Sequence, residues 1–377
     1  MADLTGTPIV GLGVTSICKG SVDGIANYTT DLLDIPKVSN EVRIEPIAFG
    51  TDDQTLKPRV IPGSYARTLI LQQLSMGLLN GFRRIPSNLS LFHSPDNRIP
   101  SGLECPVVAT IHDVFPLTRP DLMRKSFRRF GSRFYRRAMR SPDHIITISR
   151  YSKAQIKDCL GFSGDRISVV WNGIDDAWFK TIPAAERQRT LEKRHIPSTF
   201  FLAVGTIQPR KNYARIISAF ASLPRSHQSG VHLVIVGKNG WNEDLPSLIR
   251  ASGVDSRITW FDDMSNHEVR SLFQSAKALV FPSLAEGFGY PIAEAFASGC
   301  PVITSNTTSM PEVAGDSALY VDPLSVEEIR SAMIAMLERD SAIDALVASA
   351  SGRSHLFTKA RMIEQTLMVY KSVLGRS

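Results

Sequence analysis

The segment "ALVFPSLAEGFGYPIAEAFASGCPVITSN" (residues 278–306) places two short apolar runs on either side of a helix-like stretch. The runs at 278–283 and 301–306 have the length and continuous apolar character of strands that are buried on both faces of a parallel sheet. Pro291 suits the first turn of a helix, where its missing N–H has no partner to lose. The segment therefore predicts a strand, the loop "EGFGY" (286–290), a helix and a second strand.

The same alternation of apolar runs and helix-like stretches extends over most of the 377 residues. Repeated units of this kind are typical of an α/β fold with parallel sheets. Further strands are predicted at 8–14, 42–49, 88–94, 106–113, 144–149 and 167–173 in the first half, and at 199–205, 232–237, 257–263 and 318–323 in the second.

Residues 173–198 break this alternation with prolines and charged residues, which places a linker at about 174–195. A chain of 377 residues, 43% of them hydrophobic, is long enough for two cores. We therefore expect two Rossmann-like domains, residues 1–175 and 176–377, facing each other across a cleft. The expectation leaves room for the last helix to pack back on the N-terminal domain.

The positive charge is concentrated in one segment. The chain has a net charge of +7, and "RKSFRRFGSRFYRRAMR" (124–140) carries eight Arg and Lys, so the remainder sums to 7 − 8 = −1. On a helix, Phe127, Phe130, Phe134 and Ala138 would form one apolar stripe. The arginines that we single out on the remaining surface are Arg128, Arg129, Arg136 and Arg137.

Three uses fit this segment. Its helix could lie on an anionic membrane, or bind the phosphate of a lipid-linked acceptor. Alternatively, the apolar stripe packs on the sheet of the first domain and the arginines are solvated. Binding to nucleic acid is disfavoured, because the charge lies in one segment that has no platform of stacking aromatic residues.

The cysteines indicate the cellular compartment of the protein, and the apolar runs indicate whether it spans a membrane. The four cysteines are far apart, with no CxxC pair and no histidine cluster at metal-ligand spacing, which indicates a reduced compartment and no structural zinc. The first residues lack the pattern of a secretory signal, and no apolar run approaches the roughly 18 to 20 residues of a membrane span. We expect a cytoplasmic protein, with room for peripheral contact at the inner face of the cell membrane.

Ligands of open parallel sheets bind at the loops that follow the strands, and three such loops in the second half are unusual. In "VGTIQPRKN" (204–212), Arg210 and Lys211 stand where a helix begins, an arrangement that suits a bound diphosphate, although a solvated pair of cations is the alternative. In "IVGKNGW" (235–241), Gly237 would let a ligand approach the backbone closely.

The third loop is "EGFGY". Gly287 and Gly289 would leave the N–H groups of the loop facing a phosphate. Glu286 and Glu294 would then accept hydrogen bonds from hydroxyl groups on either side, so that they bracket the phosphates of a nucleotide-sugar. The alternative is that Glu286 is a solvated loop residue and Glu294 a carboxylate that the helix dipole favours.

The longer string "FPSLAEGFGYPIAEAFASGCPVITSNTTSMPEVAGDSALYVDP" (281–323) resembles the signature of glycosyltransferase family 4, retaining enzymes of the GT-B fold, whose hallmark is two glutamates separated by seven residues. The resemblance spans about residues 8–340. Other segments that share it are "GIANYTTDLL" (24–33), "FHSPDN" (92–97), "ATIHDVFPL" (109–117), "ITISRYSK" (146–153), "VVWNGID" (169–175) and "VGTIQPRKN".

The resemblance implies an N-terminal domain that binds the acceptor and a C-terminal domain that binds the nucleotide-sugar donor. Lys211 and Arg210 would contact the donor diphosphate, and Glu294 the ribose. Glu286, with the amides of Gly287, Phe288 and Gly289, would hold the transferred sugar and the phosphate. Many members have an arginine where Thr206 stands, so the cationic role here falls on Arg210 and Lys211.

In the first domain, the resemblance implies that His112 reaches the sugar and that the loop at 20–29, which contains Gly24, closes over the phosphates and the acceptor. A histidine at the position of His112 can equally be a structural hydrogen-bonding group. Front-side attack is implied, in which the leaving phosphate assists deprotonation of the acceptor. Glu286 is then assigned to donor positioning and charge stabilisation instead of covalent catalysis.

No metal or other cofactor is expected, and the adjacent acids of "FDDM" (261–264) are interpreted as a strand-end loop near the nucleotide. The function predicted is a hexosyltransferase of surface polysaccharide biosynthesis, with GDP-mannose as donor and a glycan or lipid-linked saccharide as acceptor. The alternatives are a two-domain nucleotide-sugar epimerase and a basic nucleic-acid-binding protein.

Overall fold

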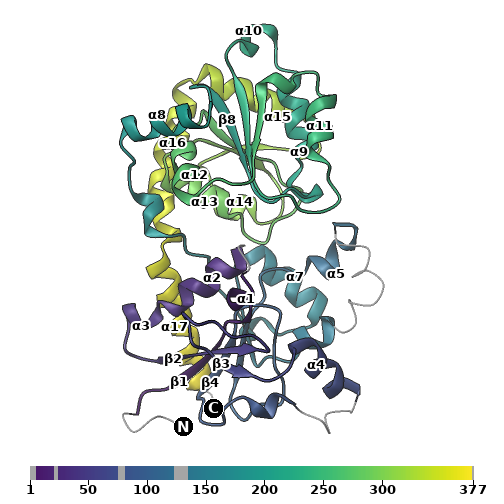
Figure 1. The fold of residues 1–377 in the computed structure, drawn as a ribbon, viewed down its shortest axis with the longest axis vertical. Helices are drawn as coiled ribbons and strands as arrows, with labels where there is room; N and C mark the ends of the chain where they lie inside the picture. Colours follow the sequence, from purple (N-terminus) through teal and green to yellow (C-terminus); the bar gives the residue numbers. More distant parts are fainter. Residues whose placement is uncertain (1–5, 21–23, 75–80, 123–134, 376–377) are drawn as a thin grey trace. The chain divides into compact units, whose positions relative to one another are not determined.

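A computed structural model describes residues 6–20, 24–74, 81–122 and 135–375 of the chain (Figure 1). The chain divides into two compact units. The first unit comprises Met1–Gly173 and Lys359–Ser377, and the second comprises Ile174–Thr358. Each unit is an α/β structure built on one parallel sheet.

The sheet of the first unit has the strand order β3-β2-β1-β4-β5-β6-β7 in the described residues. All neighbouring strands are parallel. The strands are β1 (Ile9–Gly13), β2 (Arg43–Phe49), β3 (Arg59–Ile61), β4 (Leu91–Ser94), β5 (Val107–Thr110), β6 (His144–Thr147) and β7 (Ile167–Val169).

The helices of the first unit in the described residues follow its strands, except that α17 comes after the second unit. They are α1 (Thr15–Cys18), α2 (Gly24–Leu33), α3 (Ile35–Val38), α4 (Tyr65–Leu74), α5 (Phe115–Thr118), α7 (Arg150–Leu160) and α17 (Lys359–Leu374), with the short turns η1 (Gly81–Arg84), η2 (Pro120–Leu122) and η3 (Gly164–Arg166).

The second sheet has the order β10-β9-β8-β11-β12-β13 and is also parallel throughout. Counted from its own first strand, this is the 3-2-1-4-5-6 order of a doubly wound Rossmann sheet. The strands are β8 (Phe200–Val204), β9 (His232–Val236), β10 (Ile258–Phe261), β11 (Ala278–Phe281), β12 (Val302–Ser305) and β13 (Leu319–Val321).

Nine α-helices of the second unit flank this sheet in the described residues. They are α8 (Ala184–Lys193), α9 (Tyr213–Ala221), α10 (Arg225–Gln228), α11 (Leu245–Ala251), α12 (Asn266–Phe273), α13 (Tyr290–Ala297), α14 (Met310–Ala314), α15 (Val326–Glu338) and α16 (Ser341–Ser354). The short turns are η4 (Asp176–Phe179), η5 (Pro209–Lys211), η6 (Asp255–Arg257) and η7 (His355–Phe357).

All twelve predicted strands are present, and the α/β prediction with two Rossmann-like sheets is confirmed. The strand that sequence reasoning missed is β3, which has three residues at the edge of the first sheet. Two of its three side chains are exposed, so it lacks the apolar run that marks the buried strands.

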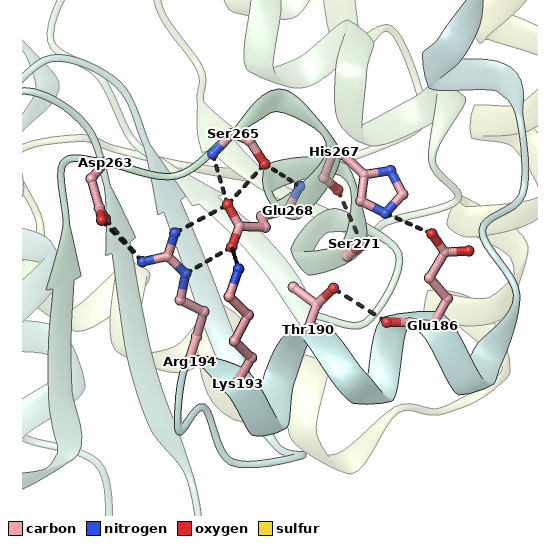
Figure 2. A network of polar contacts seen from close by, with 9 residues as sticks. All are labelled: Glu186, Thr190, Lys193, Arg194, Asp263, Ser265, His267, Glu268 and Ser271. Atoms are coloured by element: carbon pink, nitrogen blue, oxygen red, sulfur yellow. Dashed lines mark hydrogen bonds and ion pairs between the residues drawn. The ribbon is translucent and has the colours of Figure 1, made fainter.

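The linker prediction for 174–195 is wrong. This stretch contains η4 and α8 and belongs to the second unit. The network in Figure 2 joins α8 and the residues after it to α12 and to the loop after β10. Arg194 donates to both oxygens of Glu268 at 2.8 and 3.1 Å and to both oxygens of Asp263 at 3.1 Å. Charged residues that suggested a solvated linker are therefore paired across helices.

The C-terminal helix α17 belongs to the first unit, whereas the predicted boundaries assigned residues 176–377 to the second and only left room for this packing. Its apolar face enters the core beside β1, β5 and β6, where Ile363 and Tyr370 are fully buried. Tyr370 Oη lies 2.6 Å from His93 Nδ1, and His93 Nε2 lies 2.8 Å from Thr110 Oγ1. Burial lowers the pKa of His93 to about 3, so the imidazole is neutral.

Candidate functional site

The strand order of the second unit reverses between β8 and β11. In doubly wound sheets, ligands bind at the carboxyl ends of the strands at such a reversal. The loop that follows β8 contains Arg210 and Lys211, and the loop that follows β11 contains Glu286. The topology therefore brings together the two loops that the sequence singled out.

The loop after β8 turns into α9 through η5. Asn212 ends this turn with a φ of +67°, a left-handed conformation in which asparagine is enriched. Its buried amide donates to the carbonyl oxygens of Pro282 at 2.9 Å and Pro323 at 2.7 Å. Asn212, which sequence reasoning missed, thereby fixes this loop to the ends of β11 and β13.

Gly237, which is predicted to let a ligand approach the backbone, packs closely against another loop. A Cβ atom at Gly237 would lie 2.0 Å from the carbonyl oxygen of Gly205. The loops after β8 and β9 run side by side at this point, since Ile207 N donates to Lys238 O at 2.9 Å. Packing of one loop on another therefore requires glycine here, without any need for a ligand to approach.

One carboxylate lies between two cations in this site. Glu286 Oε2 accepts from Arg210 Nη1 at 2.6 Å, and Glu286 Oε1 lies 2.7 Å from Lys211 Nζ. Glu286 and Lys211 are 7% and 9% exposed, so neither charge is shared substantially with solvent. The prediction that Glu286 is a solvated loop residue, which was the alternative, is wrong.

Lys211 also packs against apolar groups. Its ammonium lies 4.6 Å from the centre of the Phe281 ring, and its side chain packs against Gly205. Burial lowers the pKa of Lys211 to about 8, although Glu286 opposes this shift. Burial would raise the pKa of Glu286, but Arg210 and Lys211 outweigh it and hold the value at about 2. The carboxylate is therefore charged at neutral pH.

Glu294 lies in the second turn of α13 and is partly buried. Burial raises its pKa to about 7, and Lys211 offsets the shift in part. The two glutamates of the hallmark therefore differ, since Glu286 is held as an anion while Glu294 changes its charge near neutral pH.

The "EGFGY" loop connects β11 to α13 as predicted, and Pro291 stands in the first turn of that helix. Gly289 precedes the helix with a φ of +113°, which favours glycine. The Phe288 ring is buried, at 5.6 Å from the Tyr290 ring and 5.7 Å from the Phe357 ring. Phe288 can thus serve a ligand only through its backbone.

His112 follows β5 in the first unit and is 8% exposed. Its Nε2 lies 2.9 Å from Pro95 O, and the Tyr28 ring packs edge-on at 5.1 Å. Gly24 is the first residue of α2, so the predicted loop at 20–29 is helical from Gly24 onward. Residues 21–23 lie outside the described residues.

The basic segment at 124–140 is described from Tyr135 onward. Arg136 and Arg137 are exposed, whereas Ala138 and Met139 are buried in the core of the first unit. The helix predicted through Phe127, Phe130 and Phe134, with Arg128 and Arg129, lies outside the described residues.

The acids of "FDDM" are at the carboxyl end of β10, where Asp263 pairs with Arg194 (Figure 2). Hydrogen bonds from Arg194 lower the pKa of Glu268, which closes the capping box of α12 with Ser265. Within the described ranges, no three His, Cys, Asp or Glu side chains gather in a metal-binding group. In the same ranges, no helix combines the length and the apolar character of a membrane span.

On the expectation that Lys211 contacts the diphosphate of GDP and Glu294 its ribose, the pKa values of these two residues predict how the affinity for GDP depends on pH. Diphosphate binding needs the charged ammonium, so affinity is expected to fall as pH rises above about 8. A ribose hydroxyl bonds best to a charged carboxylate, so affinity is also expected to fall below about pH 7. Calorimetry with GDP from pH 6 to 9.5 checks this. In Glu294→Gln, the fall in affinity at low pH should disappear and the fall at high pH should remain. A constant affinity across the range would contradict both assignments.

Comparison with known proteins identifies the family. Residues 38–178 match the family model described as Glycosyltransferase Family 4, and residues 186–351 match that of Glycosyl transferases group 1. The O-antigen chain mannosyltransferase B of Escherichia coli is 30% identical over 283 residues, which are 74% of this chain and 74% of the relative.

Two solved structures share the fold. Alr3699/HepE of Anabaena in complex with UDP-glucose aligns with a TM-score of 0.75 at 18% identity, over 97% of this chain and 99% of the other. WaaG, a glycosyltransferase involved in lipopolysaccharide biosynthesis, aligns with a TM-score of 0.70 at 18% identity, over 93% and 96%. With its two family matches, its mannosyltransferase relative and its two Rossmann-like sheets, the chain belongs to glycosyltransferase family 4 and is a glycosyltransferase of the GT-B fold.

Proposed function

We propose that this glycosyltransferase moves mannose from GDP-mannose, with retention of configuration, onto a glycan or lipid-linked saccharide in surface polysaccharide biosynthesis. The observation that carries the proposal is the cluster of Arg210, Lys211 and Glu286 at the strand-order reversal of the second unit. Two cations that share one carboxylate offer the charge that a diphosphate requires. The choice of mannose is supported by the Escherichia coli relative, an O-antigen chain mannosyltransferase.

Donor binding is assigned to the second unit. Arg210 and Lys211 hold the diphosphate, together with backbone N–H groups of residues 287–289. Glu294 accepts from the ribose hydroxyls. Because these groups are fixed before the donor arrives, they stabilise the negative charge that develops on the departing diphosphate without further rearrangement.

The transfer step is front-side displacement. The acceptor oxygen bonds to C1 of the hexose on the face from which the bond between C1 and the phosphate oxygen breaks. The acceptor proton passes to the departing phosphate oxygen, and GDP leaves. Glu286 positions the sugar and stabilises its positive charge, and His112 contacts the sugar hydroxyls. Arg210 and Lys211 supply the positive charge in this scheme, so we propose that no metal ion is required.

The acceptor side is assigned to the first unit. We propose a cytoplasmic enzyme that works at the inner face of the cell membrane, where lipid-linked saccharides are available. The exposed Arg136 and Arg137 could contact anionic headgroups there.

The first test is a panel of GDP-mannose, UDP-glucose and dTDP-glucose scored by thermal shift. A donor at 100 times its Kd stabilises the protein by about 2.7 kcal/mol, which corresponds to a rise in Tm of several degrees. GDP-mannose is expected to give the largest rise. A larger rise with either other donor would contradict the choice of GDP-mannose.

The second part of the test uses GDP-mannose in the presence of EDTA. Hydrolysis to GDP and mannose should continue, and transfer to a saccharide acceptor should give an α-linkage. A β-linked product would contradict retention, and activity that disappears in EDTA and returns with Mg²⁺ would contradict metal independence. Release of an epimerised sugar nucleotide would favour the epimerase instead.

A further inference from the structure

A row of hydroxyl side chains runs along the end of β12 and the turn into α14, next to the loop that carries Glu286. Thr304 Oγ1 donates to Phe281 O at 3.1 Å, and Ser305 Oγ donates to Ser283 O at 2.6 Å. Thr308 and Ser309 continue the row toward Glu286. The loop after β11 is therefore held by side-chain hydroxyls from the neighbouring strand along most of its length.

Ser309 contacts two carbonyl groups of the Glu286 loop. Its hydroxyl lies 2.8 Å from Glu286 O and 2.8 Å from Phe288 O, in donor geometry to both, and the side chain is fully buried. Ser309 stands at the N-cap of α14, where a serine usually accepts from the helix N–H groups, but its side chain makes no such bond. The hydroxyl serves the loop instead of its own helix.

Thr308 contacts the backbone of Glu286 from the other side. Glu286 N donates to Thr308 Oγ1 at 3.3 Å, and the same hydroxyl lies 3.4 Å from Met310 Sδ as its acceptor. Thr308 has a φ of +56°, a left-handed conformation that is rare for a β-branched residue. Strained backbone of this kind clusters at functional sites, where the surrounding structure holds it in place.

The hydroxyls of two consecutive residues, Thr308 and Ser309, thus contact the N–H and the carbonyl of Glu286. The side chain of Glu286 is held at its other end by Arg210 and Lys211. Because catalytic groups must be held within about 0.5 Å of the productive geometry, support of the backbone bears directly on the chemistry. We infer that Thr308 and Ser309 are positioning residues that fix Glu286 for glycosyl transfer.

This inference rests on the proposed role of Glu286, and a double-mutant cycle separates the two. Ser309→Ala and Thr308→Val are each made in the wild-type chain and in Glu286→Gln. The probe is hydrolysis of GDP-mannose without acceptor, with GDP affinity and Tm measured alongside. Ser305→Ala is the matched control, because Ser305 is equally buried and holds Ser283 O but does not contact Glu286.

Ser309→Ala and Thr308→Val are each expected to lower kcat about tenfold in the wild-type chain and less than about twofold in Glu286→Gln. The reason is that substitutions of residues that act as a unit do not have additive effects. GDP affinity should change less than about threefold. Thr308→Ser, which keeps the hydroxyl, should restore most of the activity. Ser305→Ala should lower Tm about as much as Ser309→Ala and Thr308→Val do, while it keeps kcat within about twofold of wild type.

Equal losses of kcat in both backgrounds would overturn the inference, as would a similar loss in Ser305→Ala. If both variants fail to fold while Ser305→Ala folds, the two hydroxyls have a structural role only and the inference is also overturned. By contrast, Glu286→Gln with wild-type hydrolysis would contradict the proposed function itself.

Discussion

Glu286→Gln is expected to lower the turnover of donor about 100-fold while GDP binds at least as tightly as to the wild-type chain. The carboxylate contacts Arg210 at 2.6 Å and Lys211 at 2.7 Å, so it occupies the two cations to which the proposed function assigns the diphosphate. A neutral amide of nearly the same shape competes less for these cations. It also loses the negative charge that stabilises positive charge on the sugar, and turnover falls for that reason.

The measurements are kcat for GDP-mannose hydrolysis and the Kd of GDP by calorimetry. Glu294→Gln is the comparison, because Glu294 is assigned to the ribose and its loss should weaken GDP binding. Full activity of Glu286→Gln would remove this residue from catalysis. A Kd for GDP that rises tenfold or more would show that the carboxylate organises the cations instead of competing for them.

Lys211→Met is expected to weaken GDP binding by about 10- to 150-fold, the range that corresponds to one hydrogen bond to a charged group. Lys211 is buried beside Phe281 and Glu286, so solvent screens its charge little. Methionine keeps most of the apolar volume and removes the charge. Calorimetry with GDP measures the effect.

Lys238→Met is the matched control for Lys211→Met. Lys238 is exposed on the neighbouring loop, whose backbone pairs with the loop of Lys211. Its removal changes the net charge by the same amount, and the Kd of GDP should change less than about threefold. Equal losses in the two variants would mean that the overall charge of the unit, and not a contact with Lys211, drives nucleotide binding.

The sequence predicted those parts of the fold that local patterns encode. Buried parallel strands are continuous apolar runs, so their positions could be assigned one by one. The two loops that contain Arg210, Lys211 and Glu286 follow two of these strands, and the Rossmann topology places them at one edge of the sheet. Their convergence could therefore be expected before any distance was known.

The features that the sequence did not predict depend on packing between segments that are distant in the chain. Nothing near Asn212 indicates that its amide bonds to Pro282 and Pro323, and nothing near Ser309 indicates that its hydroxyl serves the Glu286 loop. Gly237 is required because of Gly205, which lies in the loop after another strand. The charge of Arg194, directly after α8, suggested a solvated segment because its partners, Asp263 and Glu268, lie 69 and 74 residues away in the chain.

The position of α17 in the first unit has a consequence for the order in which the protein is completed on the ribosome. The chain passes through the whole second unit, Ile174–Thr358, before Lys359–Ser377 returns to the first. All residues of the second unit have therefore been synthesised while the first still lacks Tyr370 and the apolar residues around it. Since domains generally fold as units during synthesis, the second unit can finish folding before the unit that was begun first.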